Sequence, residues 1–66
     1  MRLLINGEPR EIDGARNIAE LIAALDLSAP ALLVEHNALA LRREEWPGRD
    51  LSDDDRIEII SIVAGG

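Results

Sequence analysis

Short apolar runs alternate with turn-forming residues along most of the chain, a pattern that predicts several short strands. The first run, residues 2–5, ends at Asn6-Gly7, a pair that tolerates the positive φ angles of a two-residue hairpin turn. The return strand is expected over residues 9–13, with Ile12 facing inward. Because Pro9 has no amide donor, this strand is predicted to lie at a sheet edge, and Gly14 is expected to end it.

One segment, residues 17–26, has the period of a helix. Asn17 is a good N-cap, and Glu20 three residues later completes a pattern typical of a capping box. Positions i, i+3, i+4 and i+7 form one apolar stripe of Ile18, Leu21, Ile22 and Leu25. Pro30 prevents any continuation of the helix. The stripe must be buried, and a sheet is the surface available to bury it.

The second half of the chain predicts three further strands. Residues 32–36 form one, residues 39–41 a short one after a turn, and the last begins at Ile57 and is rich in β-branched residues. Residues 43–46 indicate a single helical turn closed by Pro47-Gly48, in which Trp46 is expected to cover a small separate apolar cluster. Three consecutive aspartates, residues 53–55, predict a solvated turn before the last strand.

This order of elements predicts an α+β fold, with one helix packed on one face of a mixed sheet and residues 1–66 forming a single domain. Alternation with period two predicts which strand residues face the helix, namely Leu3, Ile5, Leu32, Val34, Ile57 and Ile59. Leu4, Ile60 and Ile62 are expected on the opposite face. No second helix is predicted to cover them, so they form a predicted partner-binding surface.

The last strand runs into Ala64-Gly65-Gly66, which are small residues with almost no side chain. We expect residues 63–66 to form a flexible tail that reaches about 10–14 Å and threads a narrow site in a partner. The tail ends in the α-carboxylate of Gly66, which is ionised at pH 7 and is a poor electrophile. Adenylation by ATP is the usual way to turn a carboxylate oxygen into a leaving group. The sequence has no ATP site, so a separate enzyme must perform that step.

Composition narrows the possible functions. The net charge of −6, with seven arginines and no lysine, argues against binding to phosphate backbones. No apolar run approaches the ~20 residues needed to cross a bilayer, and no signal peptide is recognisable, so a cytoplasmic protein with no nucleic-acid or membrane partner is expected. His36 is the only histidine, cysteine is absent, and the aspartates lack the spacing of a calcium loop. We therefore predict no catalytic residue, no metal and no bound cofactor.

Motifs along the whole chain resemble the ThiS family, the sulfur carrier proteins of thiamin biosynthesis in the ubiquitin-like β-grasp class. The resemblance rests on residues 3–7, 18–25, 34–37, 43–46 and 55–59 and on the Gly65-Gly66 end. It implies the sheet order 2-1-5-3-4, with the last strand central and parallel to the first. It also implies that a ubiquitin-activator-like enzyme adenylates Gly66, that a sulfur donor protein supplies the sulfur of a C-terminal thiocarboxylate, and that thiazole synthase receives this sulfur.

Two kinds of alternative remain open. The small subunit of molybdopterin synthase, or another sulfur carrier, would use the same end chemistry with a different acceptor. A ubiquitin-like protein modifier or interaction module would instead use the face with Leu4, Ile60 and Ile62, and would form an amide through Gly66. Mass spectrometry separates these functions, because a carrier exchanges one terminal oxygen for sulfur whereas a modifier is found conjugated to other proteins.

Overall fold

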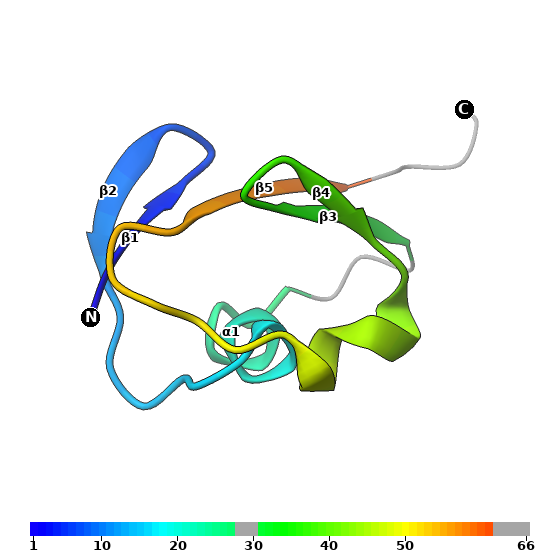
Figure 1. The fold of residues 1–66 in the computed structure, drawn as a ribbon, viewed down its shortest axis with the longest axis horizontal. Helices are drawn as coiled ribbons and strands as arrows, with labels where there is room; N and C mark the ends of the chain where they lie inside the picture. The colour runs from blue at the N-terminus through cyan, green and yellow to red at the C-terminus, as the bar shows by residue number, and fades with distance from the viewer. Residues whose placement is uncertain (28–30, 62–66) are drawn as a thin grey trace.

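In the computed structural model, which describes residues 1–27 and 31–61, five strands form one mixed sheet (Figure 1). The strands are β1 (Arg2–Ile5), β2 (Glu8–Glu11), β3 (Leu32–His36), β4 (Leu39–Leu41) and β5 (Arg56–Ser61), with the helix α1 (Ile18–Ala24) and the 3₁₀ helix η1 (Arg43–Gly48). The order across the sheet is β2-β1-β5-β3-β4. β5 is central, parallel to β1 and antiparallel to β3. The predicted fold class and sheet order are confirmed.

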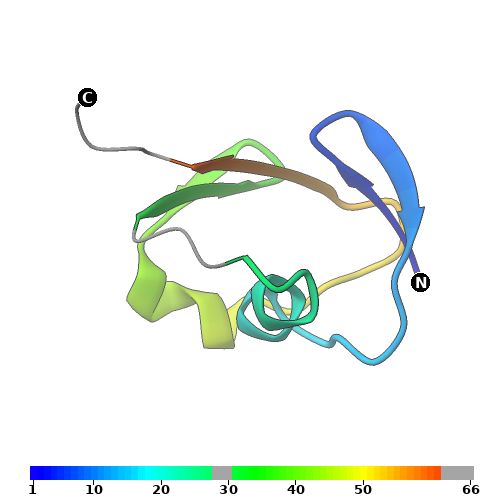
Figure 2. The same ribbon diagram turned by 180° about the vertical axis from the view of Figure 1, so that it is seen from behind.

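α1 and η1 lie on the same side of the sheet, as opposite views of the molecule agree (Figures 1 and 2). The core fills the space between them and the strands, and its largest fully buried side chains are Leu3, Ile18, Leu21, Val34 and Ile57. Of the six strand residues predicted to face the helix, four are buried, while Leu32 and Ile59 are half-buried against this core. Period-two alternation therefore assigned this face of the sheet correctly. Neither helix has the length and apolar character needed to span a membrane.

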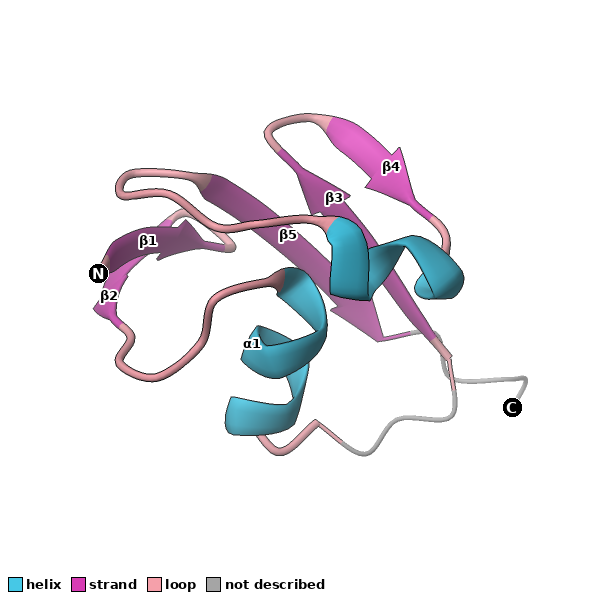
Figure 3. Cartoon of the chain, turned by 60° about the horizontal axis from the view of Figure 1, so that its bottom comes forward, coloured by secondary structure: helices cyan, strands magenta, loops and turns pink. Residues whose placement is uncertain are grey.

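Trp46 corrects one prediction. Its side chain is 6% exposed and belongs to the same core as the sheet residues, rather than to a separate cluster. The reason is that η1 extends through Pro47 and Gly48 and packs against α1 (Figure 3), which directs the ring inward. The Arg43 guanidinium lies 5.2 Å from the ring centroid, a cation–π contact that covers the ring from outside.

The helix begins where predicted and ends earlier. The Asn17 side chain accepts a hydrogen bond from the Glu20 amide at 2.9 Å, and Glu20 reaches back to the Arg16 amide at 2.8 Å. At the other end, Asp26 adopts a φ of +53° and its amide donates to the Ala23 carbonyl at 3.1 Å. This left-handed residue ends the helix before Pro30 is reached.

β2 also differs from its predicted bounds, since it covers Glu8–Glu11 instead of residues 9–13. β1 has only four residues, so the antiparallel ladder runs from Ile5 opposite Glu8 to Arg2 opposite Glu11, and beyond it a single hydrogen bond follows, from the Ile12 amide to the Met1 carbonyl at 2.8 Å. β2 does lie at the edge of the sheet, as the position of Pro9 predicted.

Both hairpins turn in the same way. Asn6 and Gly7 have φ angles of 51° and 80°, and Asn37 and Ala38 have φ angles of 50° and 71°. Positive φ at both central residues is the type I′ pattern, which matches the twist of the flanking strands. Glycine adopts this conformation without strain, whereas the Cβ atom of Ala38 makes it unfavourable.

Ala38→Gly is expected to stabilise the domain by about 0.5–1 kcal/mol. Left-handed backbone costs an ordinary residue about 1–2 kcal/mol, while the extra freedom of glycine in the unfolded chain costs less than about 1 kcal/mol. Gly7→Ala is the matched control, because a Cβ there meets no atom within 4 Å and only the φ of +80° opposes it. We expect this control to destabilise by about 1 kcal/mol. Urea unfolding measures both, and a less stable Ala38→Gly chain would contradict the account.

Candidate functional site

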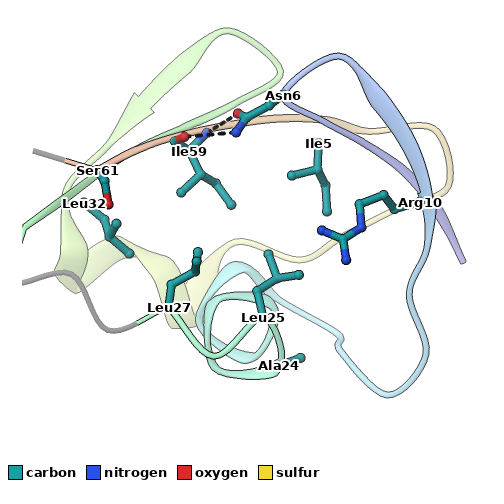
Figure 4. Close-up of a pocket in the computed structure, with 9 residues that line it drawn as sticks. All are labelled: Ile5, Asn6, Arg10, Ala24, Leu25, Leu27, Leu32, Ile59 and Ser61. Carbon is teal, nitrogen blue, oxygen red and sulfur yellow. Dashed lines mark hydrogen bonds between the residues drawn. The ribbon is translucent and has the colours of Figure 1, made fainter.

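The central strand β5 leads toward the C-terminus and is held up to Ser61 on one edge and up to Ile59 on the other. On one edge Ser61 pairs with Leu32 of β3. On the other edge β1 has ended, and the Asn6 side chain takes the place of a strand residue (Figure 4). Its Oδ1 accepts from the Ile59 amide at 2.7 Å and its Nδ2 donates to the Ile59 carbonyl at 3.1 Å. The direction in which the chain leaves the sheet is therefore fixed.

The predicted reactive end lies beyond this strand. Ile62, Ala64, Gly65 and Gly66 are outside the described residues. The modified carboxylate of Gly66 and the threading tail therefore stay predictions.

A cavity of about 330 Å³ opens beside the end of β5, between α1 and the sheet (Figure 4). It is lined by Ile5, Asn6, Arg10, Ala24, Leu25, Leu27, Leu32, Ile59 and Ser61. Six of these nine residues have apolar side chains, while Asn6, Arg10 and Ser61 make the surface of the cavity mixed in character. Among the described residues, the lining contains neither histidine nor carboxylate, so these residues supply no acid–base pair. The cavity is a contact surface of mixed polar and apolar character beside the end of β5.

His36 is buried at the end of β3, with 4% of its surface exposed. Arg49 places Nη2 at 3.1 Å and Nε at 3.3 Å from the His36 Nδ1 atom. A guanidinium only donates hydrogen bonds, so Nδ1 is the acceptor and Nε2 carries the proton. Nε2 then donates to the Asp55 carboxylate at 2.7 Å. Both ring nitrogens are engaged, so His36 joins segments of the fold and does not present a free base.

Asp55 is the centre of this network and corrects a second prediction. Asp53 and Asp54 are exposed, as predicted for the turn, but the Asp55 side chain is only 13% exposed. It also accepts from the Asn37 side chain at 3.0 Å and the Ser52 amide at 2.9 Å. Burial alone would raise the pKa of Asp55, but the hydrogen bonds from Asn37, His36 and Ser52 outweigh it and lower this pKa. The described residues bring no three histidine, cysteine or acidic side chains together as a metal site.

The face of the sheet opposite α1 carries Leu4 and Ile60, as the alternation predicted. The register aligns Leu4 with Arg56, which lies four residues before Ile60, or about 13 Å along β5. Leu4 and Ile60 are therefore not direct neighbours on this face, and the partner-binding surface of Leu4, Ile60 and Ile62 stays a prediction. The apolar neighbour of Ile60 is Leu33, directly opposite on β3. Alternation along residues 32–36 was the available signal for Leu33, since it places Leu33 on the face opposite Leu32 and Val34, and the register between β3 and β5 then sets it beside Ile60.

Comparison with known proteins agrees with this architecture. The model of the ThiS family matches residues 3–66. The sulfur carrier protein ThiS of Thermus thermophilus is 31% identical over 62 residues, which cover 94% of this chain and 95% of the relative. A thiazole synthase of Paramagnetospirillum magneticum is 27% identical over 66 residues, which are all of this chain but 20% of that protein.

A solved structure extends the likeness to three dimensions. The crystal structure of the thiamine biosynthesis protein ThiS from Geobacter metallireducens superposes with a TM-score of 0.83 at 36% identity, and the match covers 100% of both chains. This chain and the Geobacter protein therefore share the ubiquitin-like β-grasp fold as well as sequence similarity. The chain belongs to the ThiS family of sulfur carrier proteins.

Proposed function

We propose that Gly66 carries sulfur for thiazole formation in thiamin biosynthesis. An oxygen of its carboxylate attacks the α-phosphorus of ATP in the site of an adenylating enzyme, and pyrophosphate leaves. Hydrosulfide (HS⁻) supplied by a donor protein then attacks the acyl carbon, the bond from that carbon to the bridging oxygen breaks, AMP leaves with this oxygen, and the terminus loses a proton to become a thiocarboxylate. The observation that carries the proposal is that the match to the family model extends over residues 3–66 and so includes the Gly65-Gly66 end.

The geometry of the described residues supports a carrier that others act on. The strand before the terminus is held by β3 and by Asn6, so the body of the protein would present the tail in a fixed direction. The one histidine has both ring nitrogens engaged. In this proposal the partner enzyme supplies ATP and the catalytic groups, and this chain is the co-substrate. Because the reaction consumes ATP, we propose that the protein acts in the cytoplasm.

Thiazole synthase is the proposed acceptor of the sulfur. A protein of that name contains a segment similar to all of this chain, within one fifth of its own length. A second thiazole synthase, from Magnetococcus marinus, has a similar segment of the same extent. Joining a carrier-like segment to the acceptor in one polypeptide favours a functional pairing of the two, since it raises the effective concentration of each for the other.

The test is incubation with a ubiquitin-activator-like enzyme, ATP and a sulfur donor, followed by the intact mass of the chain. We expect the mass to rise by the difference between sulfur and oxygen, with the change on the C-terminal fragment. Subsequent addition of thiazole synthase and its substrates is expected to restore the original mass. An unchanged mass would overturn the proposal, and conjugation to other proteins would instead support a modifier.

A further inference from the structure

The Asn6 side chain holds the part of β5 that β1 does not reach (Figure 4). The pairing of β1 with β5 ends at Ile57. The Asn6 amide donates to the Ile57 carbonyl at 2.9 Å, and the Asn6 side chain bonds to both backbone groups of Ile59, at 2.7 and 3.1 Å. Backbone groups two residues apart on a strand face the same edge, so this one side chain continues the ladder in place of a strand residue.

The turn alone does not explain why residue 6 is an asparagine. Its φ of +51° belongs to a type I′ turn, and Asp-Gly or Gly-Gly suits such a turn as well as Asn-Gly does. Asparagine differs because its side-chain amide carries a donor and an acceptor together, and the two backbone groups of Ile59 require both. Residue 6 therefore meets a second demand, which comes from the last strand.

Ile59 lies close to the end of the chain, so its orientation matters for the terminus. Seven residues follow it, and a fully extended segment of that length spans about 23–25 Å. A rotation of about 5° at one end of such a span displaces the other end by about 2 Å. Misplacement of an attacking group by about 1 Å costs roughly 100-fold in rate. A small loss of rigidity at Ile59 is therefore large at the reacting carboxylate.

We infer that Asn6 is a positioning residue for the reactions proposed at Gly66. By holding both backbone groups of Ile59, it fixes the direction in which β5 presents the terminus to the adenylating enzyme. In this role Asn6 acts through Ile59 and takes no part in bond making. The inference rests on the proposed function, which supplies the reaction at Gly66, and it assigns part of the rate to a residue near the other end of the chain.

Asn6→Gly tests this role, because glycine keeps the turn and removes both bonds to Ile59. With ATP in excess, pyrophosphate release by the adenylating enzyme gives kcat and KM for the carrier. We expect kcat to fall about tenfold and KM to stay within about twofold, since docking is unchanged while fewer bound chains hold the carboxylate within reach. Exchange of the Ile59 amide hydrogen with deuterium should become at least about tenfold faster, because its acceptor is gone.

Asn37→Gly is the matched control. Asn37 has the same place in the other type I′ turn and holds the start of β5, where its Oδ1 accepts from the Arg56 amide at 2.8 Å and its Nδ2 donates to Asp55. Each variant loses two side-chain hydrogen bonds, so both melting temperatures are expected to fall by about 4–16 °C. Only Asn6→Gly is expected to lower kcat, measured well below both melting temperatures.

The outcomes separate the inference from the proposed function. If the wild type gains its thiocarboxylate but Asn6→Gly keeps the kcat of Asn37→Gly, the inference is overturned and the proposed function stands. A raised KM with unchanged kcat also overturns the inference, since Asn6 would then be a docking contact.

If Asn6→Gly does not fold, Asn6→Asp takes its place. It keeps the turn and loses the donor to the Ile59 carbonyl, so it is expected to lower kcat with KM unchanged, and an unchanged kcat overturns the inference. A wild type that is never adenylated overturns the proposed function and the inference together.

Discussion

A chain that lacks Gly66 is expected to form no thiocarboxylate and yet to melt at the temperature of the full chain. Removing one residue draws the terminal carboxylate back by about 3.3–3.6 Å along an extended backbone. Reaction requires the attacking atoms to approach within about 3–3.5 Å, and a misplacement of only about 1 Å costs roughly 100-fold in rate. Among the described residues the core ends at Ile57, so this deletion removes none of its side chains.

The comparison is made by intact mass after incubation with the adenylating enzyme, ATP and a sulfur donor, together with a thermal melt. Ala64→Gly is the control, because it keeps the length of the chain and the position of the carboxylate, and it is expected to react. Conversion of the truncated chain would show that the site in the enzyme tolerates a displaced carboxylate. A fall of several degrees in its melting temperature would show that the terminus contributes to folding.

Local chemistry explains why much of the fold was predictable. Asn6-Gly7 specifies its turn through the φ angles that those two residues tolerate, and Asn17 specifies the start of the helix through one side-chain hydrogen bond. Alternation along β3 and β5 identifies the buried face because side chains on a strand point alternately to its two sides. The order of the strands is not a local property, and it came from the family resemblance.

Features that depend on pairing between distant segments were not predictable from the pattern. β2 ends at Glu11, opposite Arg2, where its four-residue antiparallel partner β1 begins, and the sequence of β2 does not encode this limit. Three identical residues form the turn at 53–55, and only the position of His36 on β3 decides that Asp55 is the one turned inward. Leu33 likewise becomes a neighbour of Ile60 through the register. The Leu33–Ile60 pair and the His36 network are thus products of tertiary contact.

Asp55→Asn is expected to destabilise the domain by about 2 kcal/mol at pH 7, which lowers the melting temperature by roughly 8–16 °C. One amide oxygen can still accept from His36 and from the Ser52 amide. In the wild type, Asn37 Nδ2 donates to the other carboxylate oxygen of Asp55 at 3.0 Å. In the variant, the new NH₂ group takes the place of that oxygen and faces the same donor. Two donors meet, and one hydrogen bond to a charged group is lost. Asp53→Asn is the control, because exposed Asp53 accepts only the Arg2 amide and an amide oxygen can still do so.

The loss of stability caused by Asp55→Asn is expected to depend on pH. The folded state lowers the pKa of Asp55 below its ordinary value of 3.8, so the ionised carboxylate stabilises the fold at every pH above that value. This stabilisation is lost as the pH falls below 3.8 and through the lowered pKa, where the carboxylate of the folded chain takes up a proton. Urea unfolding of wild type and Asp55→Asn should therefore differ most near neutral pH and converge in acid. A difference in stability that is constant down to the acid limit would show that Asp55 acts through shape and not through its charge.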